Sequence, residues 1–143
     1  MISLFRLTVA GLTAGWLCAR SAAVEVALGE MVFTVPDGFT VERVAGPPLV
    51  DRPITAAFDE QGCLYVADSS GSNDPVKKQL AEKPHRIVRL EDRDGDGMFD
   101  PSVVFADTMM FPAGTLLHEV SLYVAAPPGI WRPSDTDGGG VAD

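Results

Sequence analysis

The feature that most constrains the fold of this chain is a repeat with an offset of 43 residues. The acidic segment DRDGDGMFD, residues 92–100, recurs as DTDGGGVAD at residues 135–143. The segments RIVR at 86–89 and GIWR at 129–132 are related by the same offset. Two segments that agree in their offset predict a structural unit of that length, which is the length of one four-stranded propeller blade.

Short apolar runs between turn residues predict antiparallel strands within each copy of the repeat. The tetrapeptide LYVA occurs in both copies, at residues 64–67 and 122–125, and aligns them. The expected strands are residues 54–58, 63–67, 86–90 and 103–106 in the first copy, and 115–117, 121–125 and 129–132 in the second. A further strand is predicted at residues 39–45, FTVERVA, where apolar side chains alternate with polar ones.

The predicted fold class is therefore all-β, in the form of a partial β-propeller. It would contain about one and a half to two four-stranded antiparallel blades within residues 39–143. The first blade is expected at about residues 53–106, and an incomplete second blade at about residues 111–143. The sequence Asp59–Gly62 predicts a tight hairpin, because glycine at its end can adopt a positive φ.

The first copy carries a longer connection at residues 69–85. Asp74 is a candidate N-cap, Pro75 suits the first helical position, and Lys78 and Glu82 are spaced i, i+4. These residues predict a polar loop with one or two helical turns. We favour a solvated surface connection over a loop that lines a binding face.

The N-terminus predicts export. Arg6 precedes an apolar run at residues 7–19, and small residues follow it, which is typical of a secretory signal peptide at residues 1–23. A retained membrane anchor is the alternative. The expected location is periplasmic or extracellular, with membrane association if the segment is retained. Residues 24–38 are expected to form an N-terminal extended segment.

Charge and cysteine content exclude several classes of partner and cofactor. The chain has a net charge of −9, and removal of residues 1–23 takes away two arginines and no acidic residue, giving −11. Nucleic acid and anionic membranes are therefore not expected partners. Only Cys63 then remains, which leaves no internal disulfide. The sequence contains no CxxCH motif and hence no c-type haem site.

The acidic segment at 92–100 predicts a Ca²⁺ site. Its carboxylates alternate along the chain and its glycines permit a sharp turn, so hard oxygen ligands can converge on one centre. The predicted ligands are Asp92, Asp94, Asp96, the backbone carbonyl of Met98, and Asp100. The site is not an EF-hand, since Val103 occupies the twelfth position where a bidentate glutamate is needed. The expected dissociation constant is on the order of 10⁻⁴–10⁻³ M, as in extracellular modules.

An alternative for the same segment is a hairpin turn held by Asx-type hydrogen bonds without an ion. The second copy has Gly139 in place of Asp96, so no useful metal site is predicted there. No catalytic residue is identified elsewhere. His85 and His118 are interpreted as loop histidines without a role, Tyr65 and Trp131 as packing between sheets, and Cys63 as a small buried apolar residue.

Three segments together resemble the N-terminal propeller of PVC-type membrane-bound dehydrogenases, whose propeller is similar to that of glucose/sorbosone dehydrogenases. They are VPDGFTVERVAGPPLVDRPITAAFDEQGCLYVAD, HRIVRLEDRDGDGMFDPSVVFAD and FPAGTLLHEVSLYVAAPPGIWRPSDTDGGGVAD. The resemblance covers the chain from about Phe33 onward. It implies an exported propeller that oxidises a sugar or alcohol, with a quinone cofactor and electron transfer to haem.

The chain also departs from that family. It stops within the second predicted blade, lacks the haem motif, and has His118 to Ser121 where the family favours a glycine-containing turn. The sequence therefore predicts a truncated dehydrogenase-like propeller, without activity alone, whose sugar or alcohol substrate belongs to an intact member. The alternative is a calcium-stabilised propeller segment that acts as a binding module. In either case open sheet edges are expected to promote self-association.

Overall fold

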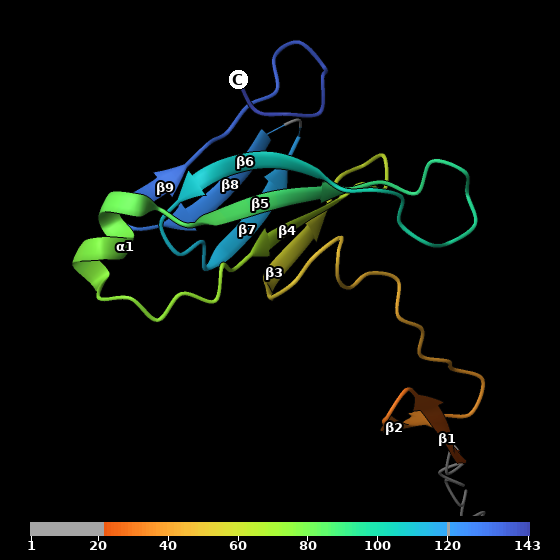
Figure 1. Ribbon diagram of the computed structural model, residues 1–143. Helices are drawn as coiled ribbons and strands as arrows, with labels where there is room; N and C mark the ends of the chain where they lie inside the picture. Colours follow the sequence, from red (N-terminus) through yellow and green to blue (C-terminus); the bar gives the residue numbers. More distant parts are fainter. Residues whose placement is uncertain (1–21, 120) are drawn as a thin grey trace, which may run out of the picture. The chain divides into compact units, whose positions relative to one another are not determined.

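The computed structural model describes residues 22–119 and 121–143 (Figure 1). It divides into two compact units, one that ends at Glu42 and one that comprises Arg43–Asp143. The predicted signal peptide lies outside the described residues except for its last two positions. Within the described part of the chain, no helix is long and apolar enough to cross a membrane.

The first unit contains a β-hairpin. Strands β1 (Ala23–Leu28) and β2 (Met31–Pro36) pair antiparallel from Ala23 opposite Pro36 to Leu28 opposite Met31. Gly29, in the two-residue turn, has φ +62°, a conformation that glycine adopts without steric cost. The prediction of an extended segment at residues 24–38 missed this pairing.

The second unit contains two antiparallel sheets, which confirms the all-β class (Figure 1). The four-stranded sheet has the order β3-β4-β5-β6, and the three-stranded sheet has the order β7-β8-β9. The strands are β3 (Pro53–Phe58), β4 (Leu64–Asp68), β5 (His85–Leu90), β6 (Val103–Met109), β7 (Gly114–His118), β8 (Ser121–Ala126) and β9 (Gly129–Trp131). All seven strands coincide with predicted ones to within three residues at each end.

The predicted strand at residues 39–45 is wrong, because these residues form no strand in the structure. Phe39 is 68% exposed and Val44 is 39% exposed. A strand depends on hydrogen bonds to a neighbouring strand. Since no described strand pairs with this segment, its alternating pattern is not sufficient to make it regular.

The connection between β4 and β5 contains the helix α1 (Val76–Glu82), which confirms the predicted helical turns. Asp74 is not the N-cap, however. Pro75 occupies that position without a side-chain cap, and Asp74 instead pairs with Lys78 at 2.9 Å. Lys83 ends the helix in the left-handed conformation, with φ +46°.

A hydrophobic core lies between the two sheets. The four-stranded sheet contributes Ala67, Ile87, Phe105 and Met109, and the three-stranded sheet contributes Leu122, Val124 and Ala126. The hydroxyls of Thr55 on β3 and Thr115 on β7 lie 3.4 Å apart, so these two strands lie side by side. Tyr65 packs edge-to-face on Phe105 with ring centroids 4.9 Å apart, as predicted for a residue between sheets.

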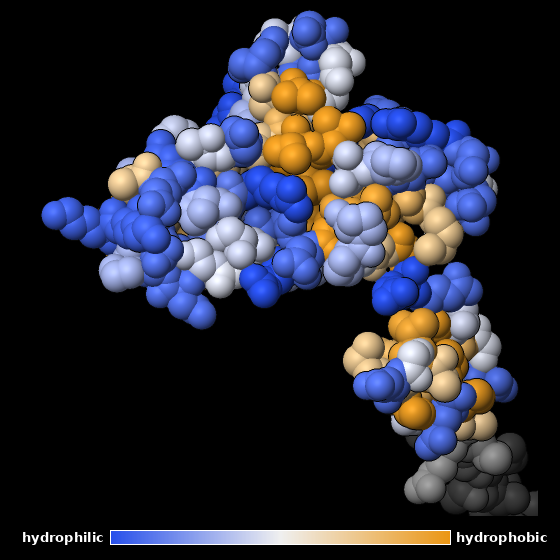
Figure 2. All heavy atoms as spheres, in the orientation of Figure 1, coloured by the Kyte–Doolittle hydropathy of each residue, from blue (hydrophilic) through white to orange (hydrophobic). Residues whose placement is uncertain are grey.

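A second apolar cluster lies on the other face of the four-stranded sheet. It contains Val50, Val66, Val88 and Leu90, with Ala45, Leu49, Leu64 and Phe99 packed against it. Burial of apolar surface contributes about 25 cal/mol per Å² to folding, so these two clusters supply the main stabilising energy of the unit. Figure 2 shows hydrophobic residues exposed at the surface in the middle of this unit, with hydrophilic residues on both sides of them.

The β3–β4 and β7–β8 hairpins differ in the residue that turns the chain. In the first, Gly62 has φ +89°, and the Asp59 carboxylate accepts the backbone N–H groups of Gln61 and Cys63. In the hairpin between β7 and β8, Glu119 has φ +53°. A side chain in this region costs roughly 1–2 kcal/mol, so the non-glycine turn noted in the sequence is accommodated with strain.

Candidate functional site

The acidic turn joins β5 to β6 at one end of the four-stranded sheet (Figure 1). At the base of the turn, the backbone N–H of Asp100 donates to the carbonyl of Glu91 at 3.0 Å. Asp92 accepts the backbone N–H groups of Gly95 at 2.8 Å and Gly97 at 3.0 Å. These bonds require the positive φ of both glycines, +76° and +87°. The turn is therefore held in shape by its own side chains.

This turn brings three of the five predicted calcium ligands together. Asp92, Asp94 and Asp100 each place a carboxylate oxygen within 4.8 Å of the others. Two oxygens that each lie 2.3–2.6 Å from one ion can be no more than about 5 Å apart, so this spacing is compatible with a shared Ca²⁺. The three carboxylates are also hard anionic ligands, which Ca²⁺ prefers. One oxygen of Asp96 accepts the N–H of Met98 at 2.7 Å. The roles of Asp96 and Met98 as ligands stay predictions.

The second acidic turn repeats the hydrogen bonding of the first. Asp135 accepts the N–H groups of Gly138 at 2.8 Å and Gly140 at 2.7 Å, and Asp143 accepts that of Thr136 at 3.2 Å. The Gly140 N–H is the main cause that lowers the pKa of Asp135. Among the described residues, the three-carboxylate group occurs in the first turn. The common hydrogen bonding shows that the shape of the turn does not require the three-carboxylate group.

A buried polar cluster lies at the opposite end of the four-stranded sheet, where β4 ends and β5 begins. Asp68, at the end of β4, is 1% exposed. Its Oδ1 accepts the backbone N–H groups of Asp51 at 3.1 Å and Arg52 at 2.8 Å. Its Oδ2 accepts two hydrogen bonds from the Arg86 guanidinium, at 3.0 and 2.8 Å. Burial raises the pKa of Asp68, but these hydrogen bonds outweigh it and leave the pKa below its ordinary value.

His85 belongs to the same end of the sheet, and its interpretation as a loop histidine without a role is wrong. It is the first residue of β5 and is 1% exposed. Its Nδ1 accepts the backbone N–H of Ser70 at 3.1 Å. Its Nε2 therefore carries the proton of the neutral ring and donates to Gln79 Oε1 at 3.1 Å. His85 thereby ties both the loop after β4 and the helix α1 to the sheet.

We expect the stability of the protein to fall as the pH drops below about 6.5, the ordinary pKa of histidine. Burial lowers the pKa of His85, so the unfolded chain binds a proton that the folded chain excludes. Neutral His85 therefore contributes fully to stability above the pKa of histidine in the unfolded chain. This contribution is lost as the pH falls toward the pKa of His85 in the folded chain, at up to about 1.4 kcal/mol per pH unit. Urea unfolding between pH 7.5 and 5 measures the slope.

The matched variants are His85→Gln and His118→Gln. His118, at the exposed end of β7, makes a suitable control, and its variant should retain the slope. The His85→Gln variant should be less stable at pH 7.5 but flatter between pH 6.5 and 5. Equal slopes in the two variants would assign the pH dependence to other groups.

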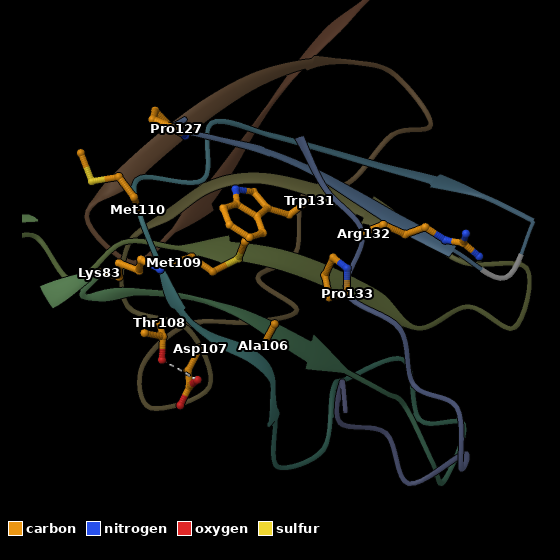
Figure 3. A pocket seen from close by; sticks show the side chains of 10 residues that line it. All are labelled: Lys83, Ala106, Asp107, Thr108, Met109, Met110, Pro127, Trp131, Arg132 and Pro133. Atoms are coloured by element: carbon orange, nitrogen blue, oxygen red, sulfur yellow. Dashed lines mark hydrogen bonds between the residues drawn. The ribbon is translucent and has the colours of Figure 1, made fainter. Parts of the chain in front are cut away.

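A cavity of about 280 Å³ opens between β6 and β9, beside the end of α1 (Figure 3). Trp131, Met109, Met110 and Lys83 are among the residues that line it. Trp131 is 44% exposed, so its prediction as a residue packed between sheets is wrong. Its indole N–H donates to the carbonyl of Ala126 at 2.8 Å, and Lys83 Nζ lies 5.8 Å from the ring centroid. The Arg132 side chain points away in Figure 3.

Cys63 is buried, as the sequence predicted. Its thiol lies 3.0 Å from Arg89 Nη2, and burial is the main cause that raises its pKa. The neutral thiol is therefore the form present near pH 7, and it is a poor nucleophile.

A family model described as a domain of unknown function (DUF7133) matches residues 25–143 of the chain. No curated protein and no solved structure matches the chain.

Proposed function

The chain belongs to the DUF7133 family, a domain of unknown function, and we propose that it is a calcium-stabilised β-propeller segment that acts as a binding module. In this proposal the four-stranded and three-stranded sheets are consecutive blades. Their order along the chain, their antiparallel pairing and the contact of β3 with β7 support it. The observation that carries the calcium role is the convergence of Asp92, Asp94 and Asp100.

Calcium would act on stability and not on chemistry. The three carboxylates repel one another at close range, and a divalent cation among them converts that repulsion into attraction. The turn lies at the far end of the sheet from the His85 cluster, with the length of β5 between them (Figure 1). An ion there would fix the β5–β6 hairpin and leave the other end of the sheet free for binding.

We expect 10 mM Ca²⁺ to raise the free energy of unfolding by about 1.4–2.7 kcal/mol, given a dissociation constant on the order of 10⁻⁴–10⁻³ M. Asp94→Asn should abolish this effect, because it removes one charge while its amide oxygen still accepts the N–H of Asp96. Asp137→Asn is the matched control, since Asp137 accepts the N–H of Gly139 in the same way. Thermal melts with calcium and with chelator, together with calorimetric titration, provide the measurement.

Identical melting temperatures with calcium and chelator, and no heat of binding, would contradict the calcium proposal. Loss of the calcium effect in Asp137→Asn as well as in Asp94→Asn would place the ion elsewhere.

A second candidate function is a segment of an exported sugar or alcohol dehydrogenase-like propeller. The resemblance of the sequence supports it, together with a polar cavity of about 250 Å³ lined by Asp68, Ser69, Ser70 and Arg86 among others. The Arg86 guanidinium is engaged by Asp68, so these residues do not make a quinone site by themselves, and no catalytic step is assigned to them. Purified chain with added quinone, a sugar and an electron acceptor is expected to show no turnover. Turnover would assign an active site to this chain alone.

A further inference from the structure

We propose that the polar cavity at the start of β5 binds a small carboxylate, through the outer edge of the Arg86 guanidinium and the hydroxyls of Ser69 and Ser70. The cavity has a volume of about 250 Å³, and its lining residues are Asp51, Asp68, Ser69, Ser70, Pro84 and Arg86. Such a ligand would serve the binding role proposed above, on which this inference rests. It would need neither the calcium ion nor the arrangement of the sheets as propeller blades.

The polar residues of the cavity are replaced by alanine, proline and glycine in the second copy of the repeat. The equivalents of Asp68, Ser69, Ser70 and Arg86 are Ala126, Pro127, Pro128 and Gly129. Asp68 lies opposite Arg86 in the pairing of β4 with β5. Their equivalents lie opposite each other in the pairing of β8 with β9, so these strands pair without the polar side chains. Strand pairing alone therefore does not account for the polar set in the first copy.

The Arg86 guanidinium is held in one orientation and still has N–H groups to donate. Its Nε and Nη2 both donate to Oδ2 of Asp68, at 3.0 and 2.8 Å. Among the described residues, none accepts a hydrogen bond from its Nη1. The outer edge of the guanidinium, formed by Nη1 and the second N–H of Nη2, is therefore available. A planar fork of this kind donates two parallel hydrogen bonds to a carboxylate.

The hydroxyls of Ser69 and Ser70 add two further donors. Both oxygens lie 3.4 Å from His85 Nδ1, whose lone pair already accepts the Ser70 N–H at 3.1 Å. Each oxygen itself accepts a backbone N–H, from Gly71 at 3.1 Å and from Ser72 at 3.2 Å. Since a ring nitrogen offers one lone pair, and no other described residue accepts these hydroxyl protons, they can be donated to a ligand. A set of donors matches a carboxylate, which only accepts hydrogen bonds.

The acidic residues of the cavity limit the charge of the ligand. Asp68 has no acceptor site left for a ligand, because its two oxygens already accept four hydrogen bonds. Asp51 also lines the cavity, with a side chain that is 61% exposed. Its negative charge repels a bound anion, and it repels a doubly charged anion more strongly than a singly charged one. A planar, singly charged carboxylate therefore fits this cavity better than phosphate does.

The test is an NMR titration of the full, isotope-labelled chain with sodium acetate, compared with sodium chloride at equal ionic strength. Acetate is expected to shift the resonances of the Arg86 Nε–H and the Ser70 backbone N–H until they saturate. The expected dissociation constant is on the order of 10 mM, because a ligand of so few atoms makes few contacts. Sodium phosphate and glucose, added separately at the same concentration as acetate, should not give saturating shifts.

Asp51→Asn should strengthen acetate binding about threefold, because it removes a negative charge from the cavity wall. A gain of affinity cannot result from misfolding, and the backbone N–H of Asp51 can still donate to Asp68. Glu60→Gln, in the exposed turn between β3 and β4, changes the net charge equally and should leave the affinity unchanged. Arg86→Lys keeps a positive charge beside Asp68 but loses the planar fork, and should weaken binding at least about tenfold.

Three results would overturn the inference. They are equal shifts with acetate and chloride, saturation by phosphate or glucose at least as tight as by acetate, and an acetate affinity that neither Asp51→Asn nor Arg86→Lys changes. Repeating the titration with chelator separates this inference from the calcium proposal. Acetate binding that persists without calcium supports the carboxylate site even if the acidic turn binds no ion. Stabilisation by calcium without acetate binding would remove the carboxylate site alone.

Discussion

Replacement of Ile87 by alanine is expected to lower the free energy of unfolding by about 3 kcal/mol, within the range of about 2–5 kcal/mol for such core truncations. Ile87 has no exposed surface and lies in the core between the two sheets. Its truncation removes packing within the cluster that includes Leu122 and Val124. It also leaves a cavity, since neighbours on two sheets cannot move freely into the space. Urea unfolding followed by circular dichroism measures the loss.

The matched control for Ile87→Ala is Ile130→Ala. The two isoleucines occupy the same position in their sheets, opposite Ala67 and Ala125. Ile130→Ala should change stability by less than about 0.5 kcal/mol, because Ile130 is 76% exposed. A similar loss of stability in both variants would mean that Ile130 is buried in the folded chain and not exposed.

The strands of the two sheets could be predicted because two kinds of signal agreed. Apolar runs such as LYVA and RIVR gave the strands, and the repeat gave their order and spacing. The hairpin at Asp59–Gly62 was predictable because its turn chemistry is local. In each of these cases the residues that decide the structure lie within a few positions of one another.

Predictions failed where pairing depends on distant or missing neighbours. Residues 39–45 have the alternation of a strand, but a strand also needs an adjacent one, and the described chain supplies none. For the β1–β2 hairpin the prediction failed in the other direction, because two paired strands were missed. Its turn, Gly29-Glu30, is a short-range hairpin signal, and the position of the segment before the repeat does not prevent its strands from pairing.

The acidic turn could be predicted as a candidate site because all its candidate ligands lie in one short segment. The cluster at Asp68 and His85 could not, because its bonds from Ser70 to His85 and from Arg86 to Asp68 join residues 15 and 18 positions apart, which strand pairing brings together. One signal was present in the repeat. Asp68 follows LYVA in the first copy where Ala126 follows it in the second. A carboxylate at the position of a buried alanine requires partners, and this difference pointed to a specific polar site.

The second large effect is expected at Asp68. Asp68→Ala should cost about 3 kcal/mol at pH 7, because it leaves two backbone N–H groups and a guanidinium without their acceptor. The Arg86 side chain is 40% exposed and can be hydrated. Most of the loss in stability therefore comes from the N–H groups of Asp51 and Arg52.

Asp68→Asn should lower stability less than Asp68→Ala, since the amide oxygen can still accept hydrogen bonds from those N–H groups. Asp51→Ala, at an exposed ion pair, should cost under about 1 kcal/mol.

The pH dependence of the Asp68 variants distinguishes the charged interaction from simple loss of packing. The pKa of Asp68 is lowered in the folded state, so its charge stabilises the protein fully above the ordinary value of 3.8 and is lost as pH falls through the folded-state pKa. The stability difference between wild type and Asp68→Asn should therefore narrow below pH 3.8. A difference that stays constant from pH 7 to pH 2.5 would mean that the ionised carboxylate contributes nothing, and that Asp68 acts only through its shape.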